Sequence, residues 1–512
     1  MNKNIVSIFI LSLLVLTGGC VQQETRSKGL NYEDIAGIVI SEKLIVDLGY
    51  FSEFPENFKV SPDNYRFAYV EKKEDKQYIV IDGENEKPFD EIGGFSFSPD
   101  SKRFAYEAKK SGKWFAVVDG KEGTHYESVK DLIFSDDSKR LAYVANDSEE
   151  WFVVVDGNEE KRYNNARMPV FSQNSERVAY EAREGDNWFV VVDGKEKNTF
   201  NSSLFPVFSP DSNRVAYVAQ EQDKWFTVFD GKEGKRYDTI LMNTLMFSPD
   251  SNNAVYVAKN DGKWFVVVNE EEEKLYDDIL KYTPIFSPDG KRIAYAANDG
   301  GSMFVVVDGT EGKKYPSILK HSISFSPDSK RVAYTAREGN KWFIVVDGKE
   351  GQRYDDILKY SPVFSPDSKR VAYAAKDNDK WFVIEETAQK NTQKNTQNKD
   401  QISFSPFQAH LATMENEDSE KQVNITITGK QYYGVIEGSL TFSPDSKHLI
   451  YGVPDSEGQS VVVDGKDGKS YDSIIFIYNG GSIFFDSKDS FHFLARKGKG
   501  VYLVEEIAAI VI

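Results

Sequence analysis

Residues 325–363 read FSPDSKRVAYTAREGNKWFIVVDGKEGQRYDDILKYSPV, and similar stretches run through most of the chain. All seven tryptophans follow the period of these copies. Self-similarity at a period of about 40 residues is the signature of a repeat architecture. The sequence therefore predicts one structural unit copied about twelve times. The residues that open the copies are Val60, Phe97, Phe134, Phe171, Phe208, Phe247, Phe286, Phe325, Phe364, Phe404, Phe442 and Phe484.

Each copy predicts four short strands. In residues 325–363 these strands are expected at 331–336, at 342–346, around Tyr354 and at 362–364. The second of them is apolar at every position, so we expect both of its faces to be buried. An Asp-Gly pair follows it in most copies and predicts a hairpin, because glycine tolerates positive φ. The Ser-Pro-Asp-Ser segment predicts a second turn, in which the aspartate accepts backbone N–H bonds.

Four-stranded units of this length, without helical periodicity, indicate an all-β protein and specifically a β-propeller. FSPDSKRVAY and its copies resemble the WD40-like repeats of TolB-like propellers in bacterial envelope proteins, over roughly residues 58–512. The resemblance implies that the DGKEGK and SPDS turns share one face of the propeller. It implies protein partners, and it is far more specific for fold than for function.

The number of copies sets the expected architecture. Propeller rings usually hold four to eight blades, so twelve four-stranded blades predict two six-bladed rings in tandem, at residues 45–285 and 286–512. One large ring is the alternative. Residues 385–400 are expected to replace the turn and outer strand of one blade, because Trp381 to Phe404 spans 23 residues and Trp342 to Phe364 spans 22.

The two ends of the chain are expected to meet. The last copy stops after two strands, and an N-terminal strand that completed this blade would hide both edges of an open ring. Tyr32–Ile35 and residues 58–60 are the candidates for the missing strands.

Residues 1–19 carry one lysine, a short apolar run and small residues before Cys20, which is the pattern of a secretory signal peptide. Its end resembles the signal of bacterial lipoproteins. That resemblance predicts lipid attachment at Cys20, with residues 20–44 as a tether and candidate closing strand. The alternative is an ordinary signal peptide in which Cys20 is incidental.

Composition excludes several classes of function. The net charge of −18 disfavours nucleic acid as a partner, because a nucleic-acid groove needs clustered cations. A single cysteine excludes an intramolecular disulfide framework, and five scattered histidines give no metal-ligand spacing. We find no catalytic motif, and we expect no metal and no cofactor.

These observations favour a non-catalytic scaffold for protein–protein interaction, anchored by lipid in the bacterial cell envelope on its periplasmic or surface side. Envelope or extracellular proteins are the expected partners, and the sequence assigns no partner-binding residue. The alternative is a glycan-binding protein, or a propeller hydrolase or lyase that uses the axial channel. That alternative requires unrepeated polar side chains that converge from different blades.

Overall fold

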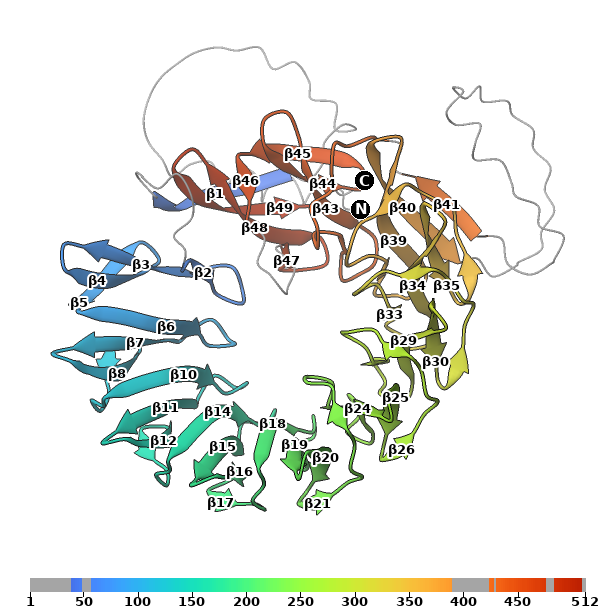
Figure 1. Cartoon of the computed structure of the whole chain (residues 1–512). Helices are drawn as coiled ribbons and strands as arrows, with labels where there is room; N and C mark the ends of the chain where they lie inside the picture. The colour runs from blue at the N-terminus through green and yellow to red at the C-terminus, as the bar shows by residue number, and fades with distance from the viewer. Residues whose placement is uncertain (1–37, 48–56, 389–422, 428–429, 476–482, 509–512) are drawn as a thin grey trace, which may run out of the picture. The chain divides into compact units, whose positions relative to one another are not determined.

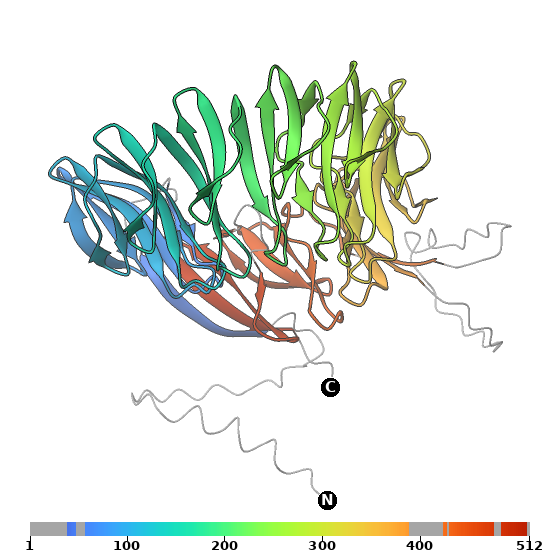
Figure 2. The same cartoon turned by 90° about the horizontal axis from the view of Figure 1, so that it is seen from below.

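The computed structural model describes residues 38–47, 57–388, 423–427, 430–475 and 483–508, and Ala36–Ile512 forms one compact unit. The described residues form eleven antiparallel sheets of four or five strands, which are the blades of a single ring (Figure 1). Figure 2 shows the blades side by side in a view turned by 90°. The prediction of an all-β propeller is confirmed.

Blades 1 to 5 each contain four strands in chain order, with the first strand nearest the centre of the ring (Figure 1). Their strands are β2 (Lys59–Val60), β3 (Phe67–Lys73), β4 (Lys76–Ile81) and β5 (Glu84–Phe89); β6 (Glu91–Phe97), β7 (Phe104–Lys110), β8 (Lys113–Val118) and β9 (Lys121–Glu122); β10 (Ser128–Phe134), β11 (Leu141–Asp147), β12 (Glu150–Val155) and β13 (Asn158–Glu159); β14 (Asn165–Phe171), β15 (Val178–Glu184), β16 (Asn187–Val192) and β17 (Lys195–Glu196); β18 (Ser202–Phe208), β19 (Val215–Glu221), β20 (Lys224–Phe229) and β21 (Lys232–Glu233).

In blades 6 to 9 the first strand is split into two short strands that pair with the same neighbour. Their strands are β22 (Thr239–Ile240), β23 (Met246–Phe247), β24 (Ala254–Asn260), β25 (Lys263–Val268) and β26 (Glu271–Glu272); β27 (Asp278–Ile279), β28 (Ile285–Phe286), β29 (Ile293–Asp299), β30 (Ser302–Val307) and β31 (Thr310–Glu311); β32 (Ser317–Ile318), β33 (Ser324–Phe325), β34 (Val332–Glu338), β35 (Lys341–Val346) and β36 (Lys349–Glu350); β37 (Asp356–Ile357), β38 (Val363–Phe364), β39 (Arg370–Asp377), β40 (Lys380–Ala388) and β41 (Val423–Ile427).

The last two blades contain both ends of the described chain. Blade 10 consists of β42 (Thr441–Phe442), β43 (Leu449–Pro454), β44 (Gln459–Val463) and β45 (Lys466–Tyr471), and blade 11 of β46 (Ser473–Ile474), β47 (Phe484–Phe485), β48 (Ser490–Lys497), β49 (Gly500–Ile507) and β1 (Ile38–Asp47).

The core lies between neighbouring blades. Phe152, Val153 and Val154 of β12 are each 0% exposed, which agrees with the expectation that this apolar strand is buried on both faces. Phe152 and Val154 pack in a cluster that includes Ala105 and Ala116 of the preceding blade. Burial of apolar surface against both neighbours is what holds each sheet in the ring.

The Ser-Pro-Asp-Ser turn joins most of the blades to the next one. Oδ1 of Asp100 accepts hydrogen bonds from the Ser98 hydroxyl (2.7 Å) and from the backbone N–H of Lys102 (3.1 Å). The backbone N–H of Asp100 donates to the Ser138 hydroxyl of the following blade at 2.9 Å. Because these bonds favour the charged carboxylate, they lower the pKa of Asp100 to about 2. The repeated aspartate is therefore a turn former.

The arginine after this turn makes a second connection between blades. Nε of Arg103 donates to Asp119 of the Asp-Gly turn at 2.9 Å, so both turns lie on one face, as the resemblance implied. Nη1 of Arg103 donates to the Ser138 carbonyl of the next blade, and its guanidinium lies 5.2 Å from the ring centroid of Phe134.

The prediction of twelve blades in two tandem rings is wrong, because no separate blade stands between the copies that Phe364 and Phe442 open. The backbone N–H of Asp367 donates to Ser446 at 2.8 Å, and the Arg370 guanidinium lies 4.8 Å from the Phe442 ring centroid. Phe404 lies outside the described residues. The ring also runs on across residue 286, between blades 6 and 8.

Blade 9 gives the physical reason for the miscount. Glu386 and Thr387 stand where most blades have Asp-Gly, so β40 continues as a strand instead of turning. Its outer neighbour, β41, begins only at Val423, and Trp381 forms its bridge with Tyr432 instead of with a residue twelve positions on. Residues 389–422 therefore interrupt one blade, and the described residues show no turn-and-strand replacement at 385–388.

The ring closes through the N-terminal strand. β1 pairs with β49 as the outer strand of blade 11, in the sheet order β1-β49-β48-β46. Tyr32–Ile35 lies outside the described residues, while Lys59–Val60 forms β2 in blade 1. Of the two strands that we expected from the N-terminal segment, blade 11 receives one, its outer strand β1. The other candidate, β2, is the inner strand of blade 1, because the strand that ends at an opening residue belongs to the blade that this residue opens.

His492 joins the last blade to the first. It is 0% exposed, its Nδ1 lies 2.9 Å from Oδ1 of Asp486, and its Nε2 lies 2.7 Å from the carbonyl oxygen of Asp63. The Tyr65 ring lies against it in a tilted arrangement, with 4.3 Å between the ring centroids. His492 is thus a satisfied structural histidine.

Residues 1–19, Cys20 and the tether as far as residue 37 lie outside the described residues. Across the part of the chain that the structure describes, we find no helix with the length and apolar character that crossing a membrane requires.

Candidate binding site on the inner wall

One position of the inner strand differs from blade to blade although the residues around it repeat. We call these side chains the inner row. All of them have positive φ, between 53° and 69°, and they follow one another at intervals of 37 to 39 residues. The row contains Asp131, Met168, Phe205, Asn243, Tyr282, His321 and Tyr360, and Gly438 takes the same place in blade 10.

Two local structures produce this conformation. In blade 3 the first strand is continuous, and its register shifts between Lys130 and Ile133. In blade 8, which is two residues longer, β32 and β33 are separated by a turn. The Ser322 hydroxyl donates to the Leu319 carbonyl (2.7 Å) and accepts from the backbone N–H of Thr335 (3.0 Å). The Ser322 hydroxyl therefore takes the place of a backbone hydrogen bond between strands. The tip of the turn between β32 and β33 is then not paired with the sheet.

The row members are accessible although they belong to the innermost strands. Met168 is 41% exposed, Tyr282 is 65% exposed and Tyr360 is 47% exposed. Positive φ is costly for bulky side chains and is common at functional positions. The row is therefore a candidate binding surface on the inner wall of the ring.

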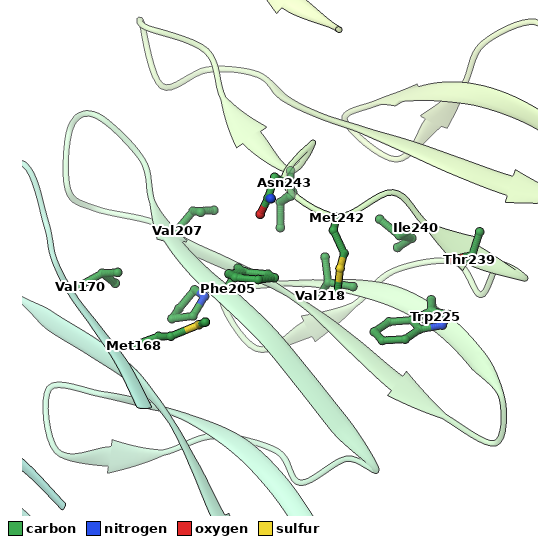
Figure 3. Close-up of a pocket in the computed structure, with 12 residues that line it drawn as sticks. Met168, Val170, Phe205, Val207, Val218, Trp225, Thr239, Ile240, Met242 and Asn243 are labelled. Carbon is green, nitrogen blue, oxygen red and sulfur yellow. The ribbon is translucent and has the colours of Figure 1, made fainter. Parts of the chain in front are cut away.

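An apolar cavity of about 490 Å³ opens beside the row in blades 4 to 6 (Figure 3). Met168, Phe205 and Met242 lie together in this view, with Trp225 beside Met242. Val170, Val207, Val218 and Leu245 complete much of the apolar lining. A cavity of this kind accepts an apolar group and offers few hydrogen-bonding partners.

A buried carboxylate fixes two walls of the cavity. Glu181 of β15 is 0% exposed and accepts a hydrogen bond from Nε of Arg167 (2.6 Å) and another from the backbone N–H of Phe205 (2.6 Å). Burial raises the pKa of Glu181 even though both bonds favour its charged form. Glu181 thus holds in position the side chain of Arg167, which precedes Met168, and the backbone at Phe205.

The Trp-Phe pair of the repeat divides between core and cavity. The expectation that this strand is buried on both faces holds for Phe226, which is 0% exposed. Trp225 is half-buried and lines the cavity instead. In blade 4 the residue that pairs opposite Trp188 is Arg183, whose guanidinium lies 5.5 Å from the Trp188 ring centroid, whereas the neutral Gln220 pairs opposite Trp225. The absence of charge at this point leaves room for an apolar ligand.

Three consecutive members of the row form an aromatic ladder. The ring centroids of Tyr282 and His321 lie 3.9 Å apart, and those of His321 and Tyr360 lie 5.3 Å apart. An exposed lysine precedes each ring in the sequence: Lys281, Lys320 and Lys359. Lys359 lies 3.9 Å from Glu437, while Lys281 and Lys320 form no ion pair within the described residues.

The structure brings together no metal-ligating group. Among the described residues, no set of three or more His, Cys, Asp or Glu side chains is placed to hold a metal ion. The prediction that the protein needs neither metal nor cofactor stays a prediction.

The chain is a β-propeller. No family model and no curated protein matches it. Similar solved structures include a eukaryotic initiation factor, with 13% identity over 61% of this chain and 91% of that chain and a TM-score of 0.37. TolB from Acinetobacter baumannii is 13% identical over 51% of this chain and 84% of its own, with a TM-score of 0.24. The β-propeller domain of the Trilobed protease from Pyrococcus furiosus is 13% identical over 51% and 94%, with a TM-score of 0.26. These likenesses concern the fold alone.

Sequence analysis missed the inner row, although two signals mark it. Glu107 and Glu181 interrupt strands where other blades have small or apolar residues, and each binds a backbone N–H near the row. The two extra residues of the later copies fall directly around the row position. We had required unrepeated side chains to converge for the glycan or enzyme alternative, and Tyr282, His321 and Tyr360 do lie together.

Proposed function

We propose that this protein is a non-catalytic interaction scaffold, attached through lipid on Cys20 to the bacterial cell envelope, that holds an envelope or extracellular protein at the inner wall of its ring. The ring supplies a rigid frame, and the cavity of blades 4 to 6 is the docking recess. Nucleic acid is not a proposed partner.

The cavity is the observation that supports this proposal. Protein interfaces concentrate binding energy in a few apolar or aromatic anchors that fill such recesses. Met168 and Met242 frame the opening, and their flexible thioether side chains adapt to differently shaped anchors. Because Glu181 fixes the backbone at Phe205, a partner meets a largely preorganised recess, which lowers the entropic cost of binding.

A photo-crosslinking amino acid at position 242 tests this proposal. Met242 is 57% exposed beside the cavity, and Leu275, 53% exposed on another part of blade 6, is the matched control. In the native envelope, the probe at position 242 should capture a defined protein that the probe at position 275 does not. Equal capture at both positions, or capture at neither, would contradict the proposal.

Anchoring has a separate test. The variant Cys20→Ser should leave the membrane fraction and appear in the soluble fraction, because a lipid chain is the proposed attachment. Retention of the variant in the membrane fraction would contradict lipid anchoring at Cys20 and leave the docking proposal untouched.

A further inference from the structure

In the aromatic ladder of blades 7 to 9, the rings of Tyr282 and Tyr360 lie against the middle ring of His321, so the faces between the rings are covered and the ring edges stay accessible. Tyr282 and His321 lie 3.9 Å apart between centroids, so each covers a face of the other. A nucleobase or a sugar needs a free aromatic face for stacking. The exposed edges carry the tyrosine hydroxyls and the imidazole nitrogens, which form hydrogen bonds.

Three lysines add positive charge to these edges. Lys281, Lys320 and Lys359 each directly precede one ring and are exposed. Lysine ammonium groups are compact point charges with three donors each, and they bind carboxylates without a fixed approach direction.

The site repeats one hydrogen-bonding edge and one ammonium group in each of three successive blades. A repeating site fits a repeating ligand, in which every unit offers hydroxyl groups and one negative charge. An acidic polysaccharide has this chemistry. A nucleic acid fits less well, because the rings leave no gap for its bases and the chain as a whole repels its phosphates.

We propose that the aromatic ladder and its lysines bind an acidic polysaccharide that carries one carboxylate on each sugar. The carboxylates pair with Lys281, Lys320 and Lys359, and the sugar hydroxyls bond to the edges of Tyr282, His321 and Tyr360. Gly438 carries no side chain, and a Cβ there would meet nothing within 4 Å, so the chain can leave the ladder past blade 10.

Calorimetric titration with an oligogalacturonate of defined length tests the proposal on the full chain. The wild type should bind this ligand and should not bind a neutral malto-oligosaccharide of equal length. The affinity should fall as salt is added, because exposed ion pairs are screened. Binding of the neutral sugar with equal affinity would overturn the proposal.

Two triple variants locate the binding. The variant K281Q/K320Q/K359Q should weaken oligogalacturonate binding about tenfold or more, since each exposed ion pair contributes modestly. The control K121Q/K195Q/K232Q removes the same charge from exposed outer strands and should leave the affinity unchanged. Equal effects of both triple variants would show a non-specific charge effect and overturn the assignment.

A conservative double variant separates edges from faces. Y282F/Y360F keeps the stack and removes both hydroxyls, and it should weaken binding about threefold. Unchanged affinity would contradict bonding at the ring edges. Tighter binding of single-stranded oligothymidylate or of a polyglutamate peptide would assign the ladder to another class of polyanion and overturn the proposal. None of these results bears on the docking recess of blades 4 to 6.

Discussion

Asp328 and His321 lie seven residues apart in the same blade and have opposite surroundings. Asp328 repeats around the ring, accepts the Ser326 hydroxyl at 2.6 Å and donates its backbone N–H to Ser368 of the next blade at 2.9 Å. His321 has a different residue in its place in every other blade, is exposed, and touches the unrepeated rings of Tyr282 and Tyr360. Repeated positions build the frame, and unrepeated positions are free to determine what it binds.

The largest expected effect concerns a repeated position in the core. Phe226→Ala should lower the free energy of unfolding by about 3–5 kcal/mol, because it leaves a cavity between two blades. Trp225→Ala should cost clearly less, since this side chain is half-buried and already borders a cavity. Chemical denaturation measures both variants, and an equal loss would contradict the division of the Trp-Phe pair.

The second effect tests a position where the repeat is broken. Glu506 of blade 11 stands where other blades have the aspartate of Asp-Gly, and burial, with a smaller effect of Glu42, raises its pKa to about 8. No hydrogen bond reaches its carboxylate oxygens within the described residues. Below about pH 4.5 the group is neutral in the folded and unfolded states, so burying it requires no loss of charge.

As the pH rises from there to about 8, the unfolded chain loses this proton while the folded protein keeps it, so the folded protein loses stability. Glu506→Gln should therefore leave stability unchanged at pH 4 and raise it by a few kcal/mol at pH 8.5. Thermal melts across this range measure the difference, with the exposed Glu457→Gln as control. A gain that does not depend on pH would refute the assignment.

A smaller effect is expected in the connections between blades. Arg103→Gln removes an ion pair with Asp119, a bond to the Ser138 carbonyl and the contact with Phe134, and should cost about 1–2 kcal/mol. Lys102→Gln is the matched control. The Lys102 side chain is 81% exposed, and its ion pair with Asp100, at 3.6 Å, lies within one turn and does not join two blades. Urea denaturation that ranked the two variants equally would show that the arginine does not connect the blades.

The smallest effect on stability belongs to the inner row. Tyr282→Ala should change the free energy of unfolding by no more than about 0.5 kcal/mol, because this side chain is 65% exposed. A loss as large as that of Phe226→Ala would show that the ladder belongs to the frame and would remove the contrast between the two kinds of position.

The repeat made the fold predictable, because FSPDSKRVAY and Asp-Gly specify strands and turns locally. The predicted number of blades was wrong because Phe404 was counted as the start of a copy. Its distance from Trp381, 23 residues, is close to the 22 residues between Trp342 and Phe364. Loss of Asp-Gly at Glu386 was the better signal, since a hairpin needs its turn residues and the spacing of aromatics alone does not make a blade. The same loss at Glu506 marks the blade that β1 completes.

The binding surface could not be predicted from spacing in the same way. Tyr282, His321 and Tyr360 come together only because successive blades bring the tips of their first strands close to one another. The cavity depends on side chains from three blades and on a buried Glu181, whose partners Arg167 and Phe205 are not its neighbours in the sequence.

The single ring closes through the pairing of β1 with β49. Ser41 pairs with Glu505 across these strands, and their side chains form a hydrogen bond at 2.7 Å. In a chain with Cys20→Ser, the pair S41C/E505C should oxidise to an intramolecular disulfide in the folded protein and release it on reduction, whereas S41C/E457C should not. Absence of the S41C/E505C disulfide under conditions where the protein is folded would contradict the single closed ring.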